Sequence, residues 1–170
     1  TLQLKLAKSW TDYPLHFHEL TSDSSTLVFE DDRLTVHTLP LQHRIYTNGF
    51  LFAEKEGLRK INTEVLADEP LESFHYHQLQ QGKDIVLDSG KTLANEAVTL
   101  PPLPPKRYAY CSDTSYLETL IPLVQGVDLL YHEATFLERH SDLAEATQHS
   151  TVRQAAQIAK AAGVKTLMVG

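Results

Sequence analysis

Four side chains in this 170-residue sequence have the chemistry and the positions needed for metal-assisted reactions. Three of them follow apolar stretches that resemble strands, and the fourth precedes an amphipathic segment. In chain order they are His43, Asp113, Glu133 and His149. Imidazole and carboxylate groups bind zinc and transfer protons near neutral pH. Because sites in layered α/β proteins form where strands end, we expect these groups to converge.

Each of these residues, taken singly, also has an ordinary structural explanation. Asp113 lies in Cys111-Ser-Asp-Thr114, and Asp and Ser are favoured at the start of a helix, so it could cap a helix instead of binding cations. His149 precedes a Ser-Thr pair that can cap a helix, which leaves its ring facing either a cleft or solvent. If the polar residues were merely caps, Glu133 and His149 would lie far apart.

Two histidine pairs elsewhere alternate as strand neighbours would, His16-Phe-His18 and His75-Tyr-His77. Alternating rings of this kind could in principle chelate a metal ion. No acidic residue is spaced to complete either set, so the sequence favours the first four residues as the site.

Composition limits the class of protein. The formal net charge of −7 argues against broad non-specific binding to nucleic acid, because phosphate contacts depend on Lys and Arg. A local basic patch remains compatible with RNA binding. No apolar run approaches the roughly 20 residues that span a bilayer, and residues 1–10 lack the features of a signal peptide. The single cysteine, Cys111, forms no internal disulfide and fits a cytoplasmic location.

The elements that must position these residues begin with three strands. Short apolar runs predict strands at residues 26–30 and 34–39, joined by a tight turn. A third strand is predicted at 44–53, with a break at Asn48-Gly49.

A polar insertion follows the third strand. Residues 54 to about 83 are charged with weak periodicity, and a short helix is predicted at 62–66 with Asn62 as its N-cap. A hairpin is predicted at 84–93. The proline-rich residues 101–105 predict a stiff, extended linker.

The last third of the sequence alternates between predicted strands and helices. The strands are predicted at 107–111, 127–132 and 165–169, and the helices at 116–124 and 150–162. His149 or Ser150 would begin the second helix and Gly163 would cap its end. This order predicts a layered α/β fold with a helix packed outside a sheet. Because the sequence stops directly after an apolar strand, we expect the chain to be part of a longer protein.

Three motifs in this last third resemble the ribonuclease Z family of the metallo-β-lactamase superfamily. They are Ala109-Tyr-Cys-Ser-Asp-Thr114, His132-Glu-Ala-Thr-Phe136 and His149-Ser-Thr151, the last followed by a similar helix and strand. Their order and spacing are similar to those in the C-terminal half of that family. The resemblance is good from about residue 107 onward, plausible over 26–53, and weak before 26 and through the insertion.

The resemblance implies a fold and a function. The fold would be one half of a four-layer αββα sandwich, so that residues 1–170 form a single partial domain. The family is identified with zinc-dependent endoribonucleases that remove 3′ trailers from tRNA precursors and leave a tRNA 3′-hydroxyl. It also implies two zinc ions per active site, a homodimer and a cytoplasmic location.

The resemblance also implies a role for each site residue. His43 would ligate one zinc ion and Asp113 would bridge both. Glu133 would orient His149, and this pair would stabilise or protonate the oxygen that leaves the phosphate.

Two features of the family are missing from the sequence. The main zinc motif, His-x-His-x-Asp-His, does not occur, and neither does the histidine expected directly after Gly170. Two ligands, His43 and Asp113, do not hold a dinuclear site. We therefore expect no bound zinc and no activity in the chain as it stands.

The insertion at 54–90 resembles the tRNA-binding arm of the family. Its phosphate contacts would be Arg59, Lys60 and Lys83. The Gly-Pro pair often found in such arms is absent, and residues 73–75 stand in its place. The alternative is an ordinary solvated loop with scattered charge.

Two other functions remain open. One is a different hydrolase of the metallo-β-lactamase fold, such as a phosphodiesterase or an arylsulfatase, which a chromogenic phosphodiester would distinguish from a tRNA nuclease. The other is a non-catalytic half-domain that serves dimerisation or RNA binding, which the missing zinc motif favours.

Overall fold

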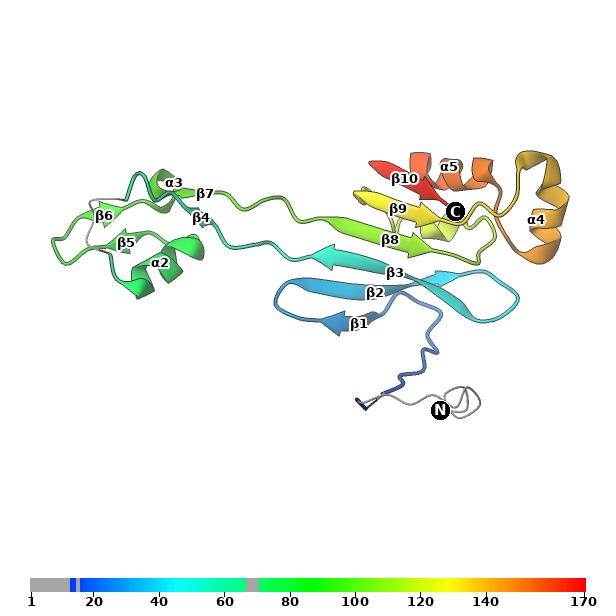
Figure 1. The fold of residues 1–170 in the computed structure, drawn as a ribbon, viewed down its shortest axis with the longest axis horizontal. Helices are drawn as coiled ribbons and strands as arrows, with labels where there is room; N and C mark the ends of the chain where they lie inside the picture. Colours follow the sequence, from blue (N-terminus) through cyan, green and yellow to red (C-terminus); the bar gives the residue numbers. More distant parts are fainter. Residues whose placement is uncertain (1–12, 15, 67–70) are drawn as a thin grey trace.

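A six-stranded mixed sheet forms the body of the protein in a computed structural model that describes residues 13–14, 16–66 and 71–170. Its strand order is β1-β2-β3-β8-β9-β10 (Figure 1). The first three pairs of neighbours are antiparallel, and β8-β9-β10 run parallel. The bounds are β1 Leu27–Glu30, β2 Leu34–Leu41, β3 Thr47–Glu54, β8 Arg107–Cys111, β9 Leu129–His132 and β10 Thr166–Val169. The predicted α/β class is confirmed.

The β1–β2 hairpin is closed by the side chain of Asp31. Its Oδ1 accepts hydrogen bonds from the backbone N–H groups of Arg33 at 2.7 Å and Leu34 at 2.8 Å. The predicted turn between the first two strands is therefore confirmed, and β2 begins directly after it.

The predicted break at Asn48-Gly49 is wrong, because β3 runs through both residues. Gly49 pairs with Leu39 on one side, and a Cβ atom at Gly49 would collide with the backbone carbonyl of Tyr110 on the other. The glycine permits close approach of β8 instead of ending the strand.

Helix α5 (Val152–Ala161) covers one face of the sheet (Figure 1). Its buried residues pack into an apolar core made of Leu39, Leu51, Ala109, Cys111, Leu120, Val124, Val127, Leu130, Ile158, Ala159 and Ala162. The helix begins in a capping box, in which Thr151 Oγ1 accepts from Gln154 N at 3.2 Å and Gln154 Oε1 accepts from Thr151 N at 2.9 Å. The N-cap residue of α5 is thus Thr151, which follows the predicted start at His149 or Ser150 in the sequence. The C-cap is Ala162, and Gly163 follows with φ 62°.

The helix predicted at 116–124 is wrong. A single 3₁₀ turn, η1 (Glu118–Leu120), is followed by turns. Pro122 has no N–H to donate and its ring opposes continuation of a helix, which explains the difference. The N-cap residue of η1 is Leu117, so Asp113 does not cap this turn.

The segment between β3 and β8 leaves the sheet and forms a separate arm (Figure 1). Its elements are β4 Lys60–Ile61, α2 Ser73–Gln80, β5 Ile85–Val86, β6 Thr92–Leu93, α3 Asn95–Val98 and β7 Thr99–Leu100. The arm has its own apolar core of Leu66, Leu79, Ile85, Leu87, Leu93 and Val98. The predicted hairpin is confirmed as β5–β6.

The helix predicted at 62–66 is wrong, because Asn62 N still donates to Val98 O across the β4–β7 pair and the following residues form turns. Helix α2 was not predicted. Outside the arm, a second unpredicted helix, α4 (Ser141–Thr147), follows the 3₁₀ turn η2 (Glu138–His140).

The opposite face of the sheet carries exposed apolar and aromatic side chains. Tyr110 stacks on Tyr131 with ring centroids 4.8 Å apart, and Phe52 stacks on Tyr108 at 5.9 Å. Phe52, Tyr110 and Met168 are all more than a third exposed. Within the described residues, none of the helices is long and apolar enough to cross a membrane.

Candidate functional site

Three of the four predicted site residues meet at one rim of the sheet. His43 lies in the loop after β2, Asp113 follows β8, and His149 lies between α4 and α5. Each offers one ligand atom, and these atoms all lie within 4.8 Å of one another. The expected convergence is therefore present in the structure.

The turn at Asp113 is held from several directions. Asp113 has φ 55°, a left-handed conformation that Asp adopts more readily than most residues. Its neighbour Thr114 is fully buried, and Thr114 O accepts a hydrogen bond from Ser150 Oγ at 2.6 Å. Thr114 Oγ1 accepts from Gln42 N at 3.2 Å. These bonds tie the end of β8 to the loop that carries His43 and to the start of α5, so the backbone beside Asp113 is held at the rim.

Glu133 is a buried carboxylate surrounded by donors. Its Oε1 accepts from Thr114 N at 2.6 Å and from His149 Nδ1 at 2.7 Å. Its Oε2 accepts from Thr135 Oγ1 at 2.7 Å and Ser150 N at 3.1 Å. Burial acts to raise the pKa of Glu133, but the bonds from Thr135, His149, Ser150 and Thr114 outweigh it and hold the pKa below its ordinary value. Glu133 is thus an ionised acceptor.

His149 is oriented by this carboxylate. Its Nδ1 donates to Glu133, so its Nε2 is the ring nitrogen available to a metal or a substrate. The ring is half-buried between His43, whose centroid is 4.9 Å away, and Phe136, whose centroid is 6.2 Å away. Glu133 and His149 therefore lie together, which contradicts the alternative in which both serve only as separate caps.

His43 is oriented in the same way by a backbone carbonyl. Its Nδ1 donates to Gln148 O at 2.9 Å, which leaves Nε2 available. Gln148 ends α4 with φ 58°, and this left-handed turn places its carbonyl on His43 and the next residue, His149, beside it. Sequence reasoning missed Gln148, because a left-handed conformation is usually signalled by Gly or Asn.

The donors at the rim fit a transition metal ion. Two imidazole nitrogens and one carboxylate oxygen are ligands that zinc takes in proteins. Both imidazoles already donate their other nitrogen to an oxygen, the arrangement that holds metal-binding histidines in proteins. Sequence reasoning counted two ligands here, and the structure places His149 beside them as a third donor.

The chain is similar over nearly its whole length to bacterial ribonuclease Z sequences. It is 40% identical to that of Porphyromonas gingivalis over 158 residues, which are 93% of this chain and 52% of the relative. It is 42% identical to that of Cytophaga hutchinsonii over 171 residues, 99% of this chain and 54% of the relative. The chain is a homologue of ribonuclease Z. It spans about half the length of the curated relatives it matches.

Two solved structures are similar to part of this chain. Human tRNase Z, short form, has a TM-score of 0.49 and 21% identity, over 86% of this chain and 39% of that one. The metallo-beta-lactamase fold protein YhfI of Bacillus subtilis has a TM-score of 0.49 and 17% identity, over 88% of this chain and 40% of that one. No family model matches the chain.

The histidine of the His132-Glu-Ala-Thr135 stretch faces the core and not the site. His132 is fully buried, and its Nδ1 donates to the Glu133 carbonyl at 2.8 Å. Burial lowers the pKa of His132, so the ring is neutral. Within the motif, Glu133 is the member that reaches the rim.

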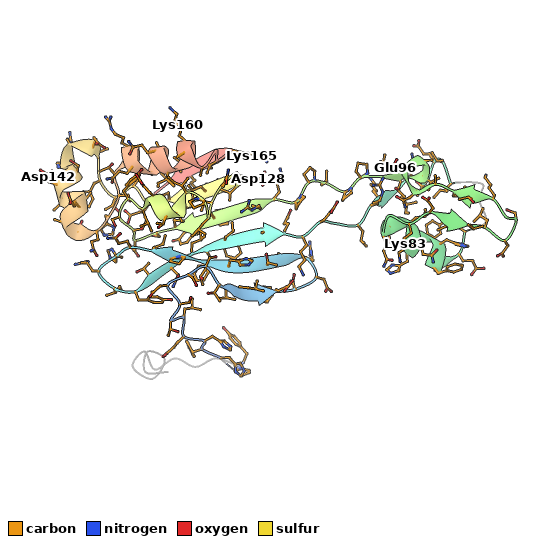
Figure 2. The ribbon with its side chains drawn as sticks, turned by 180° about the vertical axis from the view of Figure 1, so that it is seen from behind. Lys83, Glu96, Asp128, Asp142, Lys160 and Lys165 are labelled. Carbon is orange, nitrogen blue, oxygen red and sulfur yellow. The ribbon has the colours of Figure 1, made fainter. Side chains whose placement is uncertain are left out.

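The three basic residues that were predicted to contact phosphates lie on the arm, away from the rim. Arg59 is half-buried and its Nε donates to Thr99 Oγ1 at 2.7 Å. Lys60 and Lys83 are exposed. Figure 2 shows Lys83 on the arm, at a distance from the body that carries Lys160 and Asp142. The structure therefore places a charged arm surface and a polar rim on separate parts of the molecule.

Proposed function

We propose that a protein containing this chain is a zinc-dependent endoribonuclease that removes 3′ trailers from precursor tRNA and leaves a tRNA 3′-hydroxyl. The 2.7 Å bond between Glu133 and His149, beside Asp113 and His43, carries the proposal. The similarity to ribonuclease Z supports it, because the matched region covers 99% of this chain.

The residues divide into two functions. His43 and Asp113 would hold zinc, Asp113 as the bridge between two ions in the complete site. Zinc, when bound, supplies electrostatic stabilisation of the charge that develops on the scissile phosphate.

The Glu133–His149 pair would supply the proton. Because Nδ1 already donates to Glu133, the Nε2 of His149 carries a proton only in the imidazolium form. The buried carboxylate keeps the ring in one orientation. His149 Nε2 would then give its proton to the 3′-oxygen that leaves the phosphate, which becomes the tRNA 3′-hydroxyl.

The arm would bind the body of the tRNA. Lys60 and Lys83 are exposed and free to approach phosphates, and Arg59 lies beside Lys60 on the same strand end. The two extended segments between the arm and the sheet, residues 55–59 and 101–106, would set the distance between bound tRNA and the rim (Figure 1). On the ribonuclease Z likeness we further propose a homodimer in the cytoplasm.

The isolated 170-residue chain should not cleave tRNA. Among the described residues, a single group of donors could hold a metal ion at the rim, whereas the proposed reaction uses two ions. Turnover would need further ligands from outside this chain.

The test is cleavage of a precursor tRNA with a 3′ trailer by the longer protein that contains this chain, with a chromogenic phosphodiester assayed in parallel. We expect cleavage of the tRNA that ends in a 3′-hydroxyl. Strong hydrolysis of the small phosphodiester with no cleavage of precursor tRNA would overturn the proposal in favour of another hydrolase. Absence of both activities in a zinc-loaded, folded protein would favour a non-catalytic domain.

A further inference from the structure

His132 is a fully buried histidine directly before Glu133, and the proposed reaction does not use it. It ends β9, where its register partners are Cys111 of β8 and Val169 of β10. Its Nδ1 donates to the backbone carbonyl of Glu133 at 2.8 Å. The ring therefore holds the peptide group that directly follows the Glu133 side chain.

This bond stands where a backbone bond of the sheet would otherwise lie. The parallel pairing of β8 with β9 ends at Cys111 and His132, and Glu133 N still donates to Cys111 O at 2.9 Å. In a parallel ladder the next bond would run from the N–H of Asp113 to the Glu133 carbonyl. The chain turns away at Asp113, which has φ 55°. The donor to that carbonyl is instead the His132 ring.

The turn at Asp113 lets β8 hold Glu133 by its side chain. Directly after the turn, Thr114 N donates to Glu133 Oε1 at 2.6 Å, and the same oxygen accepts from His149 Nδ1 at 2.7 Å. The end of β8 thus contacts the carboxylate of Glu133 in place of its main-chain carbonyl. Because a buried carbonyl needs a donor, the His132 ring supplies the bond that β8 no longer makes.

The second nitrogen of the His132 ring argues against a role in packing alone. With the proton on Nδ1, the ring presents Nε2 as an acceptor. That atom is buried, and within the described residues it has no hydrogen-bond partner. An unpaired buried nitrogen costs stability, whereas an apolar side chain of similar size would fill the same space without that cost. The presence of an imidazole is therefore explained by the bond that its Nδ1 makes.

We propose that His132 is a positioning residue, whose bond to the Glu133 carbonyl directs the Glu133 carboxylate toward His149. This role rests on the proposed function, because it serves the proton transfer from His149 to the leaving oxygen. His132 is fully buried and touches no substrate. Its loss should therefore slow the reaction without weakening the binding of precursor tRNA.

Two substitutions separate positioning from packing. His132→Leu keeps the buried volume and removes both nitrogens, so the core stays filled while the Glu133 carbonyl loses its donor. His132→Asn is smaller and should leave the core less stable, but its side-chain amide can donate from near the place of Nδ1. Packing alone predicts that the leucine variant is the milder change, and positioning predicts that the asparagine variant is.

The first measurement uses the 170-residue chain and needs no activity. Nitrogen-resolved NMR of the histidine rings should show His132 neutral with its proton on Nδ1, and His149 with an Nδ1 proton bonded to Glu133. The His149 signal should shift in His132→Leu and return to its place in His132→Asn. Leu130→Val, a conservative change at another fully buried position of β9, is the control and should leave the signal in place.

The second measurement is cleavage of precursor tRNA by the complete protein. We expect kcat to fall by about 10- to 100-fold in His132→Leu, the usual loss when a residue that orients a functional group is removed, with KM changed by less than about twofold. His132→Asn should recover most of the kcat, and Leu130→Val should retain it.

Four results would overturn the proposal. They are a wild-type His132 with its proton on Nε2, an unchanged His149 signal in folded His132→Leu, no recovery in folded His132→Asn, or the same change in Leu130→Val. If the complete protein fails to cleave precursor tRNA, the proposed function fails. The contrast between the leucine and asparagine variants in the NMR measurement would then still show that His132 positions Glu133.

Discussion

The Glu133 carboxylate and the His149 ring meet at 2.7 Å although the two residues come from different elements, one after β9 and the other before α5. The same carboxylate also accepts from Thr114 N, after β8. One buried acidic group therefore joins the ends of two strands and the start of a helix. The Glu133 carboxylate therefore has two parts to play. Its bonds to Thr114 N and Ser150 N hold the fold together, and its bond to His149 Nδ1 orients the proposed proton donor. Loss of its charge should therefore lower both the stability of the chain and the turnover of the complete protein.

Glu133→Gln and His149→Ala should each lower turnover of precursor tRNA by the complete protein by about 10²- to 10⁴-fold, the usual contribution of a positioned acid or base. The zinc content of the complete protein should stay the same, since neither residue is a proposed ligand there. The measurement is single-turnover cleavage together with metal analysis. Glu145→Gln, the same change at an exposed position of α4, is the control. Undiminished turnover in both variants would remove the proposed role.

Asp113→Ala should instead lower the zinc content of the complete protein, because Asp113 is the proposed bridge between ions. Turnover should fall with it, and added zinc should restore part of the activity only at high concentration. Metal analysis after dialysis checks this prediction. Asp142→Ala, an exposed aspartate on α4, is the control. Full zinc content in folded Asp113→Ala would contradict the bridging role.

The types of residue at the site could be predicted from the sequence, but their supports could not. Glu133 and His149 follow recognisable motifs, whereas Gln148 carries none, because its part is played by a backbone carbonyl in a left-handed turn. Gly49 was misinterpreted for a related reason. A glycine inside an apolar run predicts a break, and only the position of Tyr110 on the neighbouring strand shows that it permits close packing.

The arm shows the same limit on prediction. Its hairpin at Ile85–Val86 and Thr92–Leu93 has a local turn signal and was found. Helix α2 was missed because it buries only His75 and Leu79, so its sequence lacks an apolar stripe. The helix predicted from Asn62 gave way to backbone pairing with Val98, a partner distant in sequence.

Gly49→Ala should destabilise the body by about 1–3 kcal/mol, the usual cost of forcing an extra carbon into a packed site. The added methyl group would meet the Tyr110 carbonyl, which is held in the β3–β8 pair and cannot move aside. Urea unfolding of the chain measures the loss. Gly57→Ala is the matched control, because its added carbon would lie 3.7 Å from Pro102 Cβ, an ordinary contact. Equal stability of both variants would contradict the close approach of β3 and β8.

Lys60→Ala and Lys83→Ala should weaken binding of precursor tRNA to the complete protein without lowering its maximal turnover. Each lost phosphate contact should reduce the slope of log affinity against log salt by about 1. The measurement is tRNA binding across a range of salt concentrations. Lys160→Ala is the control, because Lys160 is exposed on α5 in the body (Figure 2). An equal effect of all three variants would indicate general electrostatics and not an arm-specific contact.

Glu133 should also make the stability of the chain depend on pH. Its folded-state pKa lies below the ordinary value of 4.5, so its contribution is complete above that value and is lost as the pH falls through the lower, folded-state pKa. Glu133→Gln removes the charge and places an amide among the donors Thr114 N and Ser150 N. The variant should therefore be less stable than wild type at neutral pH, and the difference should shrink at about pH 3.5. Urea unfolding at both pH values measures this, with Glu145→Gln as the control that shows no such change. A stability difference that stays constant with pH would mean that the buried carboxylate is not ionised in the folded chain.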